Sequence, residues 1–140
     1  MRASNLLIGQ VGAGANSELA RIRRTPISVL LNVNNANTDI LSWSGLPAKL
    51  RIRKIEVLDP VGTLTLATLS AYTALAAGGT LLVSAFALSA LTTGLILDAT
   101  LAGAIANTVI TSGLVVLRNV TAAGGAATIS AVLEYEDLTQ

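Results

Sequence analysis

This chain of 140 residues contains no cysteine and no histidine, and 52% of its residues are hydrophobic while only 12% are charged. The composition excludes disulfides and thiol nucleophiles, and it removes the most common general base and metal ligand. The net charge is +1, and the one Trp, two Tyr and one Phe are too few for a base-stacking or sugar-binding platform.

Charge is scarce in the second half of the chain. Between residues 60 and 133 the only charged residues are Asp98 and Arg118. A globular domain is usually about one-quarter charged, so this stretch lies either in lipid or against protein. It lacks flanking Lys or Arg anchors, and glycine pairs at 78–79 and 124–125 and several Ser and Thr interrupt the run of roughly 20 apolar residues that a membrane helix needs. We therefore expect protein contacts and no membrane span.

The first 24 residues have no sustained apolar period, which predicts an extended N-terminal arm. The arm has one apolar segment and one basic cluster, which we expect to contact an acidic protein surface. A solvated segment and a nucleic-acid contact are the alternatives for the cluster, and its lack of aromatic residues weakens the second. The residues expected to make this contact are Leu6, Leu7, Ile8, Arg21, Ile22, Arg23 and Arg24.

An alternating apolar pattern predicts β-strands after the arm. In residues 26–34 one face of the predicted half-buried strand carries Ile27, Val29, Leu31 and Val33. In residues 50–58 the alternation changes parity, and a β-bulge near Arg53-Lys54 would keep every apolar side chain on the core face. These core-facing residues are Leu50, Ile52, Ile55 and Val57.

Four further strands are predicted in the uncharged region and at the C-terminus. Residues 63–72 alternate Thr and Ala with Leu, and residues 128–136 alternate apolar and polar side chains. Residues 81–88 and 114–120 are apolar on both faces, which is typical of strands covered on both sides. Residues 84–91 could instead form a short helix.

Turn signals separate these strands at short intervals. Residues 59–62 read as a turn, and two similar Ala-Gly-Gly segments, 73–80 and 121–128, predict two hairpins. Such a pattern favours an antiparallel sheet over a βαβ fold. We predict an all-β fold in which residues 25–140 form an antiparallel, jelly-roll-like β-sandwich of about seven or eight strands, preceded by the arm of residues 1–24.

Charged and aromatic residues within the predicted sandwich have structural and functional interpretations. A charged strand segment is expected to be a solvated face, with a docking surface as the alternative; it contains Arg51, Arg53, Lys54 and Glu56. The carboxylates near the C-terminus predict a solvated strand end or a subunit contact. Trp43 is either a cap over the core or an interface anchor. The candidate interface residues are Trp43, Arg51, Arg53, Phe86 and Arg118. No constellation predicts catalysis, a metal or a cofactor.

The order of several segments resembles that of a known family. These segments are Arg53–Val57, the Ala-Ala-Gly-Gly-Thr turn at 76–80, Gly113–Arg118, the Ala-Ala-Gly-Gly-Ala-Ala-Thr run at 122–128 and Glu134–Leu138. The sequence is similar in this respect to small head cement or decoration proteins of tailed bacteriophages. The resemblance implies a jelly-roll-like sandwich that often forms trimers and braces the outer capsid lattice.

We therefore expect a virion protein made in the host cytoplasm and located at the capsid surface. Its partners would be other copies of itself, as a homotrimer that buries the two-sided apolar strands, and the major capsid protein. Nucleic acid, membrane, catalysis and cofactors are not expected. A tail or head–tail connector subunit and a receptor- or glycan-binding module are the alternative functions.

Overall fold

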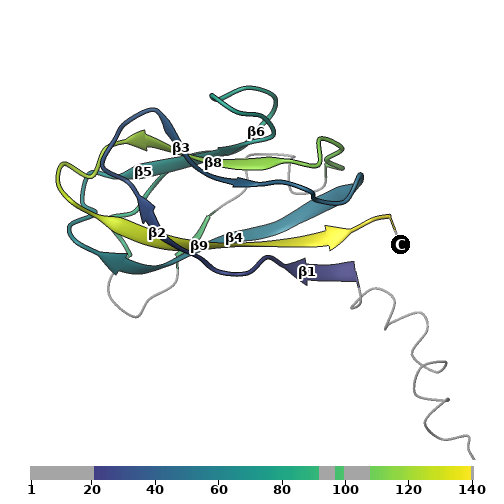
Figure 1. Cartoon of the computed structure of the whole chain (residues 1–140), viewed down its shortest axis with the longest axis horizontal. Helices are drawn as coiled ribbons and strands as arrows, with labels where there is room; N and C mark the ends of the chain where they lie inside the picture. Colours follow the sequence, from purple (N-terminus) through teal and green to yellow (C-terminus); the bar gives the residue numbers. More distant parts are fainter. Residues whose placement is uncertain (1–20, 92–96, 100–107, 140) are drawn as a thin grey trace, which may run out of the picture.

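The computed structural model describes residues 21–91, 97–99 and 108–139 of the chain. Within these ranges the chain forms two antiparallel β-sheets packed face to face (Figure 1). Sheet A contains β1 (Ile22–Arg24), β2 (Ser28–Asn32), β4 (Leu50–Val61), β7 (Leu97–Ala99) and β9 (Thr128–Asp137). Sheet B contains β3 (Thr38–Trp43), β5 (Thr68–Tyr72), β6 (Leu81–Ala87) and β8 (Val115–Thr121).

The strand order is that of a jelly roll. Sheet A has the strand order β2, β9, β4, β7, and sheet B has the order β3, β8, β5, β6. The short strand β1 also pairs with β9, next to β2 along the same edge. Every connection from β2 to β9 except β5–β6 crosses from one sheet to the other, as in a pair of Greek keys. The predicted all-β, jelly-roll-like antiparallel sandwich is confirmed.

The core lies between the sheets and depends on the bulge in β4. The pairing of β4 with β9 shifts register between Ile52 and Lys54, as predicted. The shift keeps all four predicted apolar side chains of β4 buried, and these are Leu50, Ile52, Ile55 and Val57. Leu117 of β8 and Leu133 of β9 are likewise fully buried in the same cluster. Trp43 also lies in the core, so the cap interpretation describes it better than the interface one.

Three predicted boundaries differ from the observed ones. Ile22–Arg24, assigned to the arm, form β1 and pair with β9, so the sheet begins within the predicted arm. β4 continues through Asp59 and Pro60, because a second register shift after Leu58 accommodates the proline, and the turn follows at Gly62. The strand predicted over 63–72 begins only at Thr68.

The two Ala-Gly-Gly segments have different roles. Residues 73–80 join β5 to its antiparallel neighbour β6 and form the predicted hairpin. Residues 122–127 instead join β8 in sheet B to β9 in sheet A, so the second predicted hairpin is wrong. The two segments are similar in sequence but turn differently, with positive φ at Ala76, Ala77 and Gly79 in the first and at Gly124 in the second.

The two strands predicted to be covered on both sides, β6 and β8, differ in how much of each is buried. β8 is central in sheet B, and its consecutive residues Val115, Val116 and Leu117 are all fully buried within this one chain. β6, which is a strand and not the alternative helix, lies at the edge of sheet B and exposes Leu81, Ser84 and Ala85. Burial of β8 therefore needs no second copy.

Candidate interaction surface

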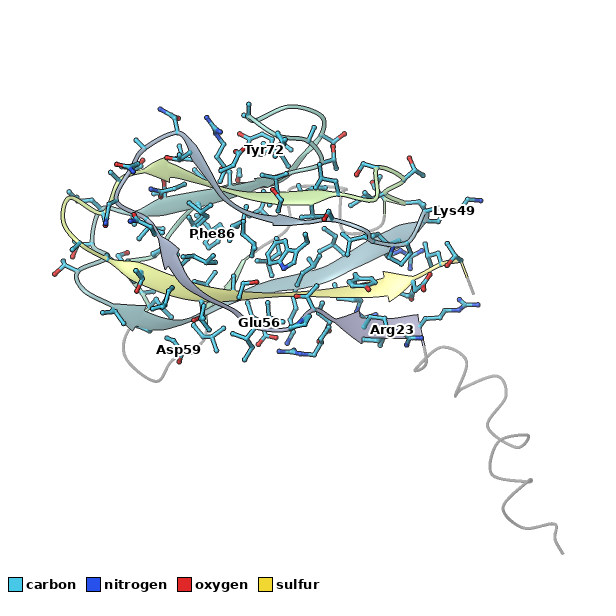
Figure 2. All side chains as sticks on the ribbon, in the orientation of Figure 1. Arg23, Lys49, Glu56, Asp59, Tyr72 and Phe86 are labelled. Carbon is cyan, nitrogen blue, oxygen red and sulfur yellow. The ribbon has the colours of Figure 1, made fainter. Side chains whose placement is uncertain are left out.

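The outer face of sheet A carries two kinds of side chain, and along its central strand β9 it is buried at Ser130, Val132 and Glu136. Along β9, Ile129, Ala131 and Leu133 belong to the core, so the residues between them lie on the opposite face. These outward residues are Ser130, Val132, Glu134 and Glu136. Figure 2 shows Glu56 and Asp59 of the neighbouring β4 on this side of the molecule, away from Tyr72 of sheet B.

One half of this face is a network of ion pairs. Arg24 on β1 bonds through Nη1 to Oε1 of Glu56 and lies 3.2 Å from Oε2 of Glu134. Nζ of Lys54 lies 3.8 Å from the same Glu56 oxygen. Glu56 needs these cations, because its side chain is only 8% exposed and a buried carboxylate without a partner is costly. The hydrogen bond to Glu56 raises the pKa of Arg24, which stays charged.

The network has balanced charge. Nη1 of Arg51 lies 3.4 Å from Oε1 of Glu136, which adds one cation and one anion to the group. The cations are Arg24, Arg51 and Lys54, and the anions are Glu56, Glu134 and Glu136. Arg24 therefore has acidic partners within its own sheet, and its contact with an acidic protein surface stays a prediction.

The other half of the face is apolar and exposed. Ile27, Val29, Leu30 and Val61, here called the apolar patch, have exposed fractions of 54, 59, 74 and 61%. Val29 and Leu30 fall within the register shift of β2, opposite Ser130, while Val61 pairs with Thr128 on the other side of β9. The predicted burial of Ile27 and Val29 is wrong, because this shift breaks the alternation and only Leu31 and Val33 face the core.

The outer face of sheet B is covered by the chain itself. The connection between β5 and β6 folds back over this sheet (Figure 1), and the amide of Ala76 donates a 2.8 Å hydrogen bond to Asp39 on β3. Nη1 of Arg118 on β8 donates to the other oxygen of Asp39 at 2.7 Å. Val116 and Ser70, which face outward, are consequently buried. The outward faces of both sheets are therefore buried at their central strands, β5 and β8 in sheet B and β9 in sheet A.

The Asp39–Arg118 pair predicts a pH-dependent stability. Burial tends to raise the pKa of Asp39, but the hydrogen bonds from Ala76 and Arg118 and the charge of Arg118 outweigh it, so this pKa lies below 3.8. A carboxyl with a lowered pKa stabilises the fold above its unfolded pKa, and this contribution disappears as the pH falls through the folded value. We expect Asp39→Asn to cost about 1–2 kcal/mol at pH 7 and less at pH 3, measured by urea unfolding. An equal cost at both pH values would contradict the role of the charge.

The structure does not gather the predicted interface residues into one site. Trp43 is in the core, and Phe86 lies between the sheets (Figure 2). Arg51 and Arg118 are held in ion pairs on opposite sheets. Arg53 is exposed at the bulge of β4. The segment Leu6, Leu7 and Ile8 lies outside the described residues.

Sequence reasoning missed the most exposed residue of the patch. Leu30 stands between Val29 and Leu31, where the predicted alternation requires a polar side chain. This mismatch was a visible signal of either a bulge or an exposed apolar contact.

Two hollows lie on the surface of the described part of the chain. One, of about 130 Å³, is lined largely by the hydroxyl side chains of Thr73, Thr80, Thr108, Thr111 and Ser112. Another, of about 270 Å³, includes Asp39, whose carboxylate is already paired. No three His, Cys, Asp or Glu side chains group into a potential metal site in the part of the chain that the structure describes. Among the same residues, no helix combines the length and hydropathy needed to cross a membrane.

Comparisons with protein-family models, with curated proteins and with solved structures found no match. The fold defines the chain as an all-β jelly-roll protein, with exposed apolar side chains on the outer face of sheet A near β2 and at the end of β4. The functional argument therefore rests on the chemistry of that face.

Proposed function

We propose that this protein is a structural subunit of a tailed-bacteriophage virion, which binds the capsid lattice as a cement or decoration protein. It acts as a homotrimer and performs no catalysis. Jelly rolls occur in capsid proteins, lectins and cupins, so the fold permits this function without selecting it.

The observation that carries the proposal is the set of exposed apolar side chains on the outer face of sheet A, which are Ile27, Val29, Leu30 and Val61. Large apolar side chains left exposed on one face of a small protein often mark a contact with another macromolecule. This patch lies beside ion pairs that are already satisfied, so a partner can cover the face without leaving a charge unpaired. These properties suit an assembly contact.

The proposed mechanism is thermodynamic. A trimer repeats each contact three times, so modest contacts to neighbouring capsid subunits add up through avidity. Binding only to the assembled lattice then stabilises that lattice by mass action. Arg21 and Arg23 are the proposed contacts to acidic capsid surface, with exposed Arg53 in place of Arg24, and Leu6–Ile8 are the proposed apolar anchors.

Co-sedimentation with heads of the encoding virus tests the proposal. We expect saturable binding to DNA-filled heads, and the Arg21→Ala/Arg23→Ala/Arg53→Ala variant should bind at least about tenfold more weakly, because three copies repeat each small charge contribution. Lys49→Ala, which removes an exposed cation from the β3–β4 connection, is the control and should bind normally. Binding to purified tails alone would favour the tail or connector function, and binding to neither particle would refute the proposal.

A further inference from the structure

The apolar patch is smaller than the contact that a folded partner makes and well suited to a short segment of chain. It exposes on the order of 400 Å², whereas a standard interface buries about 800 Å² on each side. The patch does not extend across sheet A, because Val132 and Glu136 of β9 and Glu56 of β4 are already buried on the same face. Whatever covers the patch therefore occupies a narrow strip beside β2 and at the end of β4.

The backbone holds part of this strip in place. Leu30 is 74% exposed, and its φ of +56° lies in the left-handed region, which leucine rarely adopts. It falls within the register shift between Ser28 and Leu31. Backbone strain of this kind persists only where the surrounding structure enforces it, and it clusters at contact sites. Leu30 is therefore presented for a contact before anything covers it.

The segment of chain that precedes β1 starts from the same edge of sheet A. β1 begins opposite Glu136 of β9, and Leu30 lies opposite Ser130 of the same strand. The start of β1 and Leu30 are thus six residues apart along β9, or about 20 Å. Residues 9–20 can span about 40 Å when extended. Leu6–Ile8 can therefore reach the patch even though the chain has to reverse its direction.

The composition of this segment matches the strip. Leu6–Ile8 are consecutive large apolar residues, and no residue from 3 to 17 is charged. An uncharged segment loses no ion solvation when it covers apolar side chains. Between these residues and β1 lie Gly9, Gly12 and Gly14. Glycine adopts the backbone conformations that a reversal of the chain requires.

Tethering favours this segment over a separate partner. Two groups of one chain meet at an effective concentration on the order of millimolar. A contact of small area, too weak to hold a separate protein at micromolar concentration, is therefore still formed within the chain. A separate protein with a similar apolar segment lacks this advantage.

We infer that Leu6–Ile8 pack on the apolar patch of their own chain in the free protein. The inference rests on the proposed function, because these residues and the patch are its apolar contacts with the capsid. The segment shields both from water until a capsid surface displaces it. The contact is therefore autoinhibitory, and it confines apolar binding to the assembled lattice.

Introduced cysteines test this contact in the full-length protein, because the chain has no cysteine of its own. Leu7→Cys is combined with Val61→Cys in the patch, and with Lys49→Cys in a control. Lys49 is exposed, and its carbonyl oxygen accepts a hydrogen bond from Leu138, close to the start of β1. A segment without a preferred contact would therefore reach Lys49 more readily than Val61.

We expect Leu7→Cys/Val61→Cys to form a disulfide within one chain at least about tenfold faster than the control under mild oxidation. Non-reducing gels separate single chains from linked ones, and mass spectrometry of proteolytic peptides identifies the disulfide. Val61 is 61% exposed, so its substitution removes no core contact, and thermal unfolding of the reduced variant checks the fold.

Three results of the oxidation are distinct. Faster linkage to Val61→Cys within one chain would support the inference. Equal rates, or faster linkage in the control, would overturn it, because the segment would then have no preference for the patch. Disulfides that join two chains at Val61→Cys would also overturn it, because the segment would then cover the patch of a neighbouring copy.

Binding to heads separates the inference from the proposed function. With both correct, the oxidised Leu7→Cys/Val61→Cys variant binds heads at least about tenfold more weakly than its reduced form, because the disulfide holds the anchors on the patch. Equal binding of the two forms would overturn the autoinhibitory role. The expected disulfide in a variant whose reduced form binds no heads would support the contact and refute the capsid function. Head binding without preferred linkage to Val61→Cys would refute the inference alone.

Discussion

Replacing Gly62 by alanine is expected to destabilise the fold by about 2–5 kcal/mol, whereas the same replacement at Gly45 should cost only about 1–2 kcal/mol. Both glycines have positive φ, +85° and +66°, so both substitutions carry a similar backbone penalty. The difference is space: a Cβ at Gly62 would collide with the backbone carbonyl of Ala126, while a Cβ at Gly45 meets nothing within 4 Å.

The collision at Gly62 matters because two connections meet there. Gly62 begins the β4–β5 connection, and Ala126 ends the β8–β9 connection, so neither backbone can move without disturbing strands of both sheets. Urea unfolding of the two variants at equal protein concentration, followed by the fluorescence of buried Trp43, measures the difference. Equal losses of stability would show that the two loops can separate at little cost.

The sequence predicted the fold class because the core strands have an unambiguous pattern. The parity change in β4 located its bulge, since no other arrangement buries Leu50, Ile52, Ile55 and Val57 together. The alternation of β9 similarly identified its core face. Both signals depend only on the alternation of apolar and polar residues within one strand, and both strands bury the predicted face.

The surfaces were harder to predict because they depend on which parts of the chain cover one another. Residues 26–34 have the same apolar pattern as a buried strand, yet Ile27 and Val29 are exposed because the register shift in β2 turns them away from the core. Val116 of β8 faces outward and is buried, because the β5–β6 connection covers sheet B. The low charge of residues 60–133 therefore reflects both self-coverage and exposed apolar surface.

The candidate site was only partly visible in the sequence. The charged segment of β4 was identified, but its ion-pair partner Arg24 was assigned to the arm. That pairing joins residues 32 positions apart through β9, which lies between β1 and β4. Sequence spacing alone gives no signal for such a contact.

One polar residue inside the apolar run of β8 predicts a second large effect. Asn119 is fully buried, and its Nδ2 donates hydrogen bonds of 2.9 and 2.7 Å to the backbone carbonyls of Val33 and Asn35. These bonds attach the β2–β3 connection to sheet B. Asn119→Asp preserves the shape but replaces the donor by a carboxylate that faces two carbonyl oxygens.

We expect Asn119→Asp to destabilise the fold by about 3–5 kcal/mol at pH 7, because a buried charge loses its solvation and gains no partner. Burial raises the pKa of the introduced carboxyl, so the folded state takes up a proton more readily than the unfolded state, and the loss should shrink as the pH falls toward about 4. Asn37→Asp, in the exposed part of the same connection, should change stability by less than about 0.5 kcal/mol. Urea unfolding of both variants against the wild type at each pH measures these effects. A loss that is the same at pH 4 and pH 7 would mean that steric change, and not the buried charge, is responsible.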